Sequence, residues 1–175
     1  MPLDTLVLDT IAAECTYGFE TPDMDRAILD LTDRAFGPGR YVKTAERLRE
    51  GSKPLPQFSF VARQGQKLAG SVRLWPVVVT EDEVAQPVVF LGPIVVDDVY
   101  RGLGIGKTLI RMALEAADKA GVQAVILVGA QGFFAPFGFA RAEGLTLPGP
   151  VDPKRLLIRY AKPGRSLRGH VSQGV

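Results

Sequence analysis

Three glycines, an arginine and a lysine are gathered in residues 101–107, between a β-branched run and a segment with helical spacing. Glycine has no Cβ atom, so the backbone N–H groups near Gly104 and Gly106 can come within hydrogen-bond distance of a ligand. N–H groups in the first turn of a helix have no internal partner, and the helix dipole adds partial positive charge at the same end. The stretch therefore predicts a backbone site for phosphate groups, unless its glycines serve only a tight strand-to-helix turn.

Known phosphate-binding loops differ in the spacing of their glycines, and two types fit this stretch poorly. In the P-loop pattern G-x-x-x-x-G-K-S/T, Gly106, Lys107 and Thr108 match the end, but Arg101 stands where the first glycine is required. In the dinucleotide pattern G-x-G-x-x-G, Lys107 or Leu109 stands at the last glycine, depending on the register. Both nucleotide readings are therefore disfavoured.

A third pattern, typical of acyltransferases that bind coenzyme A, has Gln or Arg, then Gly three residues later and Gly or Ala two beyond that. It fits here as Arg101, Gly104 and Gly106. With this pattern the sequence resembles the GNAT superfamily of N-acetyltransferases, and within it the YhbS-like branch of predicted acetyltransferases. The resemblance covers roughly residues 17–160 and is carried by LGPIVVDDVYRGLGIGKTLI, AVILVG, FGF and LPGPV.

The resemblance implies a fold, a co-substrate and a reaction. The fold is α/β (α+β), the GNAT-like acyl-CoA N-acyltransferase fold, with one mixed central sheet splayed at its fourth strand and flanking helices. The co-substrate is acetyl-CoA, with no metal, and the reaction is direct transfer of the acetyl group to an amine of a small molecule or protein. The alternative is an acyl-CoA-binding module with weak or no catalysis.

The resemblance also assigns residues to coenzyme A. The backbone of the strand would bind the pantetheine arm, and the loop would cradle the pyrophosphate. The backbone N–H of Val95 is the expected donor to the oxyanion, and Gly92-Pro93 marks the bulge that splays the sheet, unless it is only a strand edge. The expected coenzyme-binding residues are Ile94, Val95, Val96, Arg101, Gly102, Leu103, Gly104, Ile105, Gly106, Lys107, Phe134 and Phe137.

One position departs from the family pattern. The family often places a tyrosine, as proton donor to the departing thiolate, five residues before the phenylalanine of "GF", and here that position is Phe134. Phenylalanine cannot donate a proton, so this position favours the binding-module alternative. The other candidate donors, for each of which a packing role is favoured, are Tyr17, Tyr100, Tyr160 and Cys15. The catalytic residues and the acceptor amine are left unassigned.

The composition disfavours several other classes of protein. The formal net charge of +2 is too small to argue for nucleic acid, and one cysteine with one histidine, His170, argue against a zinc site built on those ligands. No apolar run approaches the roughly 20 residues that span a bilayer, and the first residues lack the basic segment of a secretory signal. We therefore expect a cytoplasmic protein without a nucleic-acid or membrane partner, and a homodimer is left open.

A mixed series of strands and helices must position these residues. We expect strands at 15–19, 58–64, 67–79, 88–96, 124–129 and 155–161, and helices at 21–35, 42–51 and about 104–120. Residues 133–139 should hold a short helix or turn, and residues 80–87 read as an exposed acidic turn. The chain should form one domain, 1–175, with peripheral terminal segments at 1–14 and 163–175, the second of them loose.

Overall fold

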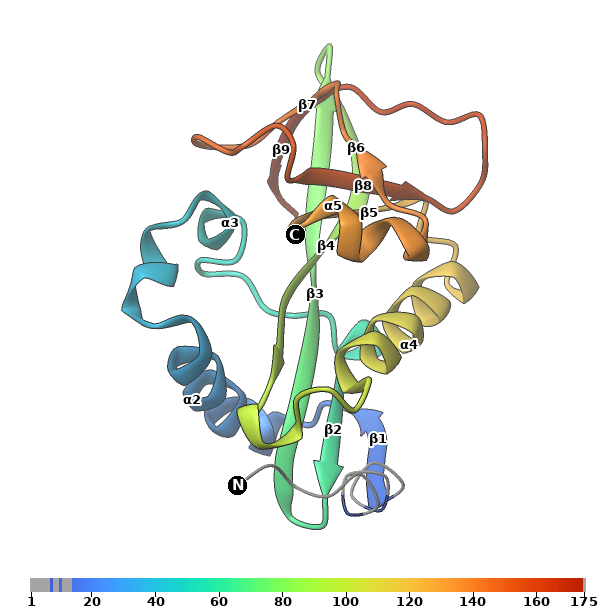
Figure 1. The fold of residues 1–175 in the computed structure, drawn as a ribbon. Coiled ribbons are helices and arrows are strands. Elements are labelled where there is room, and N and C mark those ends of the chain that lie inside the picture. The colour runs from blue at the N-terminus through green and yellow to red at the C-terminus, as the bar shows by residue number, and fades with distance from the viewer. Residues whose placement is uncertain (1–6, 8–9, 11–13, 175) are drawn as a thin grey trace.

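The strands of the protein form one mixed sheet (Figure 1). The computed structural model describes residue 7, residue 10 and residues 14–174. The sheet order is β1-β2-β3-β4-β5-β8-β6, and β9 pairs with both β3 and β7. The strands are β1 Cys15–Phe19, β2 Phe60–Gln64, β3 Lys67–Glu81, β4 Val84–Val96, β5 Ala124–Val128, β6 Ala140–Arg141, β7 Leu145–Thr146, β8 Leu156–Tyr160 and β9 Gly169–Gln173. The pairs β4–β5 and β7–β9 are parallel and the others antiparallel, which confirms the expected mixed α/β sheet.

Two longer helices cover opposite faces of this sheet. They are α2, Asp25–Phe36, and α4, Ile105–Lys119, and shorter helices are α3, Thr44–Arg47, and α5, Gln131–Phe134. The alternation along β2 shows the two faces, because Phe60 packs in one cluster with Leu109 of α4, whereas Val61 packs in another with Ile28 of α2. Figure 1 shows α2 and α4 on either side of β3 and β4. Within the described part of the chain, no helix is long and apolar enough to cross a membrane.

The helix predicted at residues 42–51 is shorter in the structure than expected. Its α-helical part is only Thr44–Arg47, and a 3-10 helix over Pro38–Val42 precedes it. Gly37, which ends α2, has a φ of 71°, a left-handed value that favours glycine. The chain between α2 and β2 is therefore a series of short turns.

The exposed turn expected at residues 80–87 is also much shorter than predicted. The strands β3 and β4 form a long antiparallel hairpin that runs to the pair Glu81 and Val84. Only Asp82 and Glu83 connect them, with φ values of 49° and 66°. Positive φ at both residues is the conformation of a tight two-residue hairpin turn, whose twist matches that of the strands.

The prediction of a loose C-terminal tail is wrong for residues 169–173, which form β9 and pair with β3. Val171 stands opposite Val79 and is fully buried. A Cβ atom at Gly169 would lie 2.1 Å from the backbone oxygen of Thr80, so only glycine permits this approach. The tail thus completes the sheet beside the β3–β4 hairpin. The segment 1–14 lies almost wholly outside the described residues.

The sheet opens between β4 and β5. These strands pair only at Val89 with Val125 and at Phe90 with Ile126. After Phe90, β4 continues to Val96 with β3 as its one pairing strand among the described residues. The register of the β3–β4 pair shifts between Val72 and Leu74, opposite Gly92-Pro93. The predicted splay at the fourth strand is therefore confirmed.

Candidate functional site

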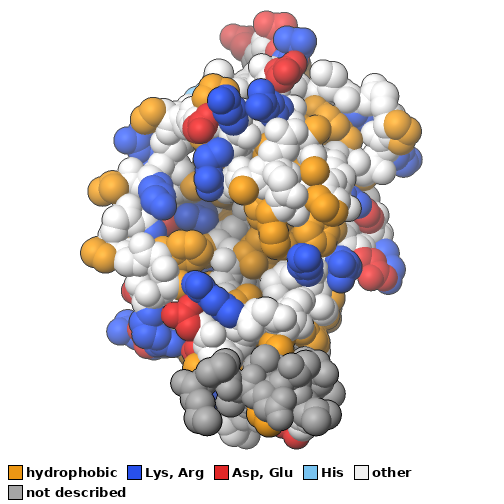
Figure 2. All heavy atoms as spheres, in the orientation of Figure 1, with side chains coloured by type: hydrophobic (Ala, Val, Ile, Leu, Met, Phe, Trp, Pro, Cys, Tyr) orange, Lys and Arg blue, Asp and Glu red, His pale blue; other side chains and the backbone are white. Residues whose placement is uncertain are grey.

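A cavity of about 710 Å³ fills the gap between the diverging strands. One wall is β4 from Phe90 to Ile94, and another is the end of β5 with Phe134 of α5. The turns between α2 and β2, and residues 150–155, complete it. Figure 2 shows this face hollowed, with hydrophobic side chains inside the hollow and Lys and Arg side chains around it. The volume lies in the usual range of small-molecule sites.

The backbone of β4 presents hydrogen-bonding groups to the open side of the sheet. The N–H of Asp97 donates to the backbone oxygen of Ala69 on the β3 side, at 2.9 Å. Backbone N–H groups alternate in direction along a strand. The N–H of Val95, which stands opposite Ser71, therefore points toward β3, as that of Asp97 does. The N–H groups of Ile94 and Val96 therefore face the edge that β5 has left.

The glycine loop joins the end of β4 to the start of α4. Gly102 and Gly104 have φ values of 81° and 77°, so the turn itself requires glycine there, whatever it binds. Gly106 differs, since it lies inside the helix and a Cβ atom there would only touch Val96 at 3.6 Å. Thr108 donates the first backbone hydrogen bond of α4, to Gly104, at 3.0 Å. The N–H groups before it in this turn have no helical acceptor.

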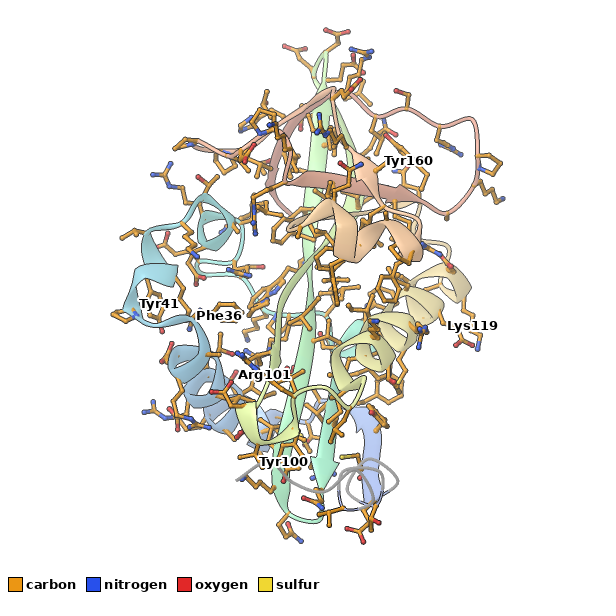
Figure 3. All side chains as sticks on the ribbon, viewed as in Figure 1. Phe36, Tyr41, Tyr100, Arg101, Lys119 and Tyr160 are labelled. Carbon is orange, nitrogen blue, oxygen red and sulfur yellow. The ribbon has the colours of Figure 1, made fainter. Side chains whose placement is uncertain are left out.

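The side chains of the loop differ in what they can offer a ligand. Arg101 (labelled in Figure 3) and Lys107 are exposed. Arg101 forms an exposed ion pair with Asp98 at 2.8 Å. Leu103 is partly buried, and Ile105 is buried in the core at 2% exposure. Ile105 can therefore contribute only its backbone to a bound group.

Phe134 lies on the wall of the cavity, as its sequence position suggested. It is 9% exposed, and its ring covers Gly129, where a Cβ atom would stand 2.5 Å from a ring carbon. Its ring contacts Phe133 and Phe139 edge to face, with centroids 4.9 and 5.8 Å apart. Phe137 lies outside the cavity wall, with the Arg111 guanidinium 5.7 Å from its ring centroid. Sequence reasoning missed Gly129, although a glycine directly after a buried strand was the available signal.

The other candidate proton donors are engaged elsewhere. The hydroxyl of Tyr100 donates to Gln64 at 2.8 Å, and that of Tyr160 accepts from the N–H of Leu167 at 2.8 Å. Tyr17 packs against the main core, as does Cys15, whose thiol pKa is raised by burial and by the nearby charge of Glu14. None of these four side chains lines the cavity, and Figure 3 shows Tyr100 and Tyr160 at opposite ends of the molecule.

A network of charged side chains stands beside the cavity and was not foreseen. Arg40 is 7% exposed and donates to Asp33 at 2.8 Å and to Glu46 at 3.4 Å. Arg49 donates to the same oxygen of Glu46 at 3.1 Å. Burial lowers the pKa of Arg49, and Glu46 offsets this in part. For Arg40 burial acts in the same direction, but hydrogen bonding to Asp33 and the charge of Glu46 leave its pKa raised.

A second ion pair holds the aromatic segment that follows β5. Arg159 of β8 donates to both oxygens of Asp118 on α4, each at 2.8 Å, and to the backbone oxygen of Phe137 at 3.0 Å. The hydrogen bond from Arg159 holds the pKa of Asp118 below its usual value. This bidentate pair thus joins α4, β8 and the segment that carries Phe134.

This pair should make stability depend on pH in the acid range. A carboxyl group with a lowered folded pKa stabilises the protein above its unfolded pKa of about 3.9, and this contribution is lost as pH falls through the folded pKa. We expect native protein to lose more stability than Asp118→Asn between pH 6 and about pH 3, measured as urea midpoints. Asp30→Asn, at an exposed ion pair with Arg26, is the control and should behave like native protein. Parallel curves for native protein and Asp118→Asn would contradict the prediction.

The chain resembles known proteins over most of its length. A curated relative from Escherichia coli (strain K12), described as the uncharacterized N-acetyltransferase YjhQ, is 29% identical over 152 residues, which are 82% of this chain and 83% of the relative. The crystal structure of the GNAT family N-acetyltransferase YhbS from Escherichia coli in complex with CoA has a TM-score of 0.75 and 25% identity, and covers 92% of this chain and 90% of that one. A GNAT family acetyltransferase from Brucella melitensis, in complex with acetyl-CoA, has a TM-score of 0.69 and 24% identity, with 92% and 96% covered.

A family match covers the elements that form the site. The acetyltransferase (GNAT) family matches residues 25–139, which include β4, the glycine loop, α4, β5 and Phe134. The likeness to YhbS and YjhQ confirms the branch that the sequence resembles. No group of three or more His, Cys, Asp or Glu side chains that could hold a metal ion occurs in residues 14–174. The family match, on a sheet splayed beside a glycine loop, shows that the chain belongs to the acetyltransferase (GNAT) family.

Proposed function

We propose that the protein is an acetyl-CoA-dependent N-acetyltransferase that works as a single domain and transfers acetyl directly to an amine. The observation that carries the proposal is the unpaired edge of β4, which runs from the cavity straight into the glycine loop at the start of α4. A ligand with an extended arm and a pyrophosphate fits this sequence of features. A cytoplasmic location and a homodimer stay predictions.

Coenzyme A would lie along this edge. The pantetheine arm would bind the backbone of Ile94 and Val96 as an added strand does. The pyrophosphate would accept from the N–H groups of residues 102–107, where the start of α4 adds partial positive charge. Arg101 and Lys107, both exposed, would supply full charges to the phosphates.

The proposed oxyanion donor is one residue earlier in β4 than the sequence resemblance implies. The alternation of β4 directs the N–H of Val95 toward β3, whereas that of Ile94 faces the open edge beside the cavity. We therefore assign the donor to Ile94 in place of Val95. A backbone donor fixed in a strand needs no reorganisation when negative charge develops on the carbonyl oxygen.

The transfer forms one bond and breaks another. A neutral amine attacks the thioester carbon, the new N–C bond forms, and the C–S bond breaks as the tetrahedral intermediate collapses. The amine loses one proton and the thiolate gains one, so the products are an amide and free CoA thiol. No tyrosine lines the cavity in the described part of the chain, and Phe134 stands at the position of the expected donor. Because phenylalanine cannot donate a proton, this position favours a second candidate function, an acyl-CoA-binding module with little catalysis.

Changing Gly104 to valine should weaken coenzyme binding. Gly104 has a φ of 77°, which a β-branched residue cannot adopt without strain, so the first turn of α4 and its N–H groups would shift. We expect a loss of about 2 kcal/mol in affinity for acetyl-CoA, or roughly 30-fold in Kd by calorimetry. ATP and NAD should bind native protein far more weakly.

Gly121→Val is the matched control. Gly121 follows α4 at its other end, has a φ of 79° and, like Gly104, has no atom within 4 Å of its Cβ position. It should cost similar strain and leave the affinity for acetyl-CoA unchanged. Equal affinity in a folded Gly104→Val protein, or tighter binding of ATP than acetyl-CoA, would refute the assignment.

A further inference from the structure

The lining of the cavity carries excess positive charge. Four cationic side chains line the cavity, and the one acidic side chain in its described lining is Asp152. In Figure 2, Lys and Arg side chains border the hollow. The four cationic side chains are Arg40, Lys43, Arg49 and Arg155.

Arg49 is the largely buried cation of this set that keeps unsatisfied donors, whereas Arg40 is matched by two carboxylates. Its side chain is 10% exposed, and among the described residues only its Nη2 has a partner, an oxygen of Glu46 that also accepts from Arg40. Its Nε is buried without a hydrogen-bond partner among the described residues. Its Nη1 lies beside Gly92, 3.5 Å from where a Cβ atom would stand. Arg49 lines the cavity, and its Nη1, unlike the buried Nε, is open to an acceptor atom of a ligand.

Two further cationic side chains line the cavity without a charged partner in the part of the chain that the structure describes. Lys43 and Arg155 are exposed, and neither forms an ion pair within residues 14–174. Arg40, by contrast, is already matched by Asp33 and Glu46. Asp33, Glu46 and Asp152 offset part of the charge of the four cations. In residues 14–174, Lys43, Arg155 and the Nη1 of Arg49 have no carboxylate partner.

The phosphates of coenzyme A do not account for this charge. Residues 101–107, which the proposed function gives to the pyrophosphate, do not line the cavity. Gly92, beside Arg49, lies two residues before Ile94, the proposed oxyanion donor, on the side away from the glycine loop. A molecule that contacts Arg49 would thus approach the thioester from the acceptor side.

We propose that the acceptor is a small amine that carries a carboxylate, and that Arg49 binds this carboxylate with help from Lys43 and Arg155. The inference rests on the proposed acetyl transfer. Guanidinium N–H groups and carboxylate oxygens have matching geometry, and charge-assisted hydrogen bonds are the strong ones. A carboxylate held at Arg49 places an amino group a few bonds away, beside β4, where the thioester carbonyl is expected. The amine is then acetylated, and CoA leaves as its thiol.

The test compares amino acids with their amides. Native protein with acetyl-CoA is assayed for release of CoA thiol with the standard α-amino acids, β-alanine and 4-aminobutyrate, each beside its carboxamide and a simple alkylamine. We expect kcat/KM to be roughly 10- to 100-fold higher for at least one carboxylate-bearing amine than for its amide. In Arg49→Met this preference should disappear through a higher KM, while the affinity for acetyl-CoA is retained.

Two further measurements keep folding and function apart. In Arg49→Met an apolar side chain replaces the guanidinium, and Glu46 keeps its ion pair with Arg40, so no carboxylate is left unpaired and the melting temperature should not fall far. Arg26→Gln, an exposed arginine of α2, is the control and should keep the native preference. Amides that react as well as amino acids, or an unchanged preference in Arg49→Met, would overturn the inference and leave acetyl transfer intact. If acetyl-CoA binds but no amine reacts, the proposed transfer and the inference fail together.

Discussion

Replacing Glu20 by alanine is expected to lower the free energy of unfolding by about 3–5 kcal/mol, because it strands a buried charge. Arg73 of β3 is 3% exposed, and its Nε and Nη2 donate to the two carboxylate oxygens of Glu20 at 3.0 and 2.6 Å. Nη2 also donates to Asp25 at 2.8 Å. Burial by itself lowers the pKa of Arg73, but its hydrogen bonds to Glu20 and Asp25 leave it raised. Without Glu20, one contact to the more exposed Asp25 remains.

The loss should be measured by urea unfolding, with Arg26→Ala as the control. That change removes an exposed ion pair four residues apart on α2, and it should cost no more than about 0.5 kcal/mol. A loss below about 1 kcal/mol in Glu20→Ala would mean that water or another group solvates Arg73, against its low exposure. Arg73 stands at the register shift opposite Gly92-Pro93, so the pair lies where β4 begins to diverge from β5.

Local patterns predicted those elements whose cause is local. The helix α4 was placed from its apolar spacing and from the glycines at both ends, and it runs over Ile105–Lys119. The strand β1 was placed at the residues where it is found, Cys15–Phe19. Apolar period and end signals lie within a few residues of one another, so a sequence reveals them without its partners.

The remaining elements depend on partners that a sequence does not display. Residues 169–173 become a strand only because β3 offers an edge there, and the tight turn at Asp82 and Glu83 follows from how far β3 and β4 stay paired. The direction of the Val95 N–H depends on which residues of β3 and β4 form hydrogen-bonded pairs. The hydrogen bond from Asp97 to Ala69 shows this, and it is visible only in the structure. Long-range pairing thus overrides local propensity at these positions.

The candidate site also has one part that local sequence predicts and one part that depends on distant segments. The glycine loop is a single segment, so its residue types and spacing pointed to it directly. The Arg40, Glu46 and Arg49 network joins short turns to a cavity whose other walls are β4, β5 and residues 150–155. No sequence motif links such distant segments, so the sequence did not predict which residues line this cavity.

Changing Phe134 to tyrosine is expected to speed acetyl transfer, because it would place a proton donor on the wall of the cavity. The ring lines the gap between β4 and β5, where the thioester is proposed to lie, and the sequence resemblance implies a tyrosine donor at this position. A positioned general acid contributes about 10²- to 10⁴-fold in rate. We expect a gain of at least about tenfold in single-turnover release of CoA thiol, using the best amine of the amino-acid panel. The affinity for acetyl-CoA should stay unchanged, since the ring keeps its contacts with Phe133 and Phe139.

Phe133→Tyr is the matched control for this change. Phe133 precedes Phe134 on α5 and is 43% exposed, but it does not line the cavity, so its hydroxyl should leave the rate unaltered. The pH profile separates a true proton donor from a packing effect, because the gain in Phe134→Tyr should vanish at alkaline pH as the new hydroxyl ionises, above its ordinary pKa of about 10 since the position is buried. A slower Phe134→Tyr protein with native affinity for acetyl-CoA would mean that the hydroxyl is buried without a partner, at a cost to the site. The thiolate would then take its proton from water, and Phe134 would serve to close the cavity rather than to limit the reaction.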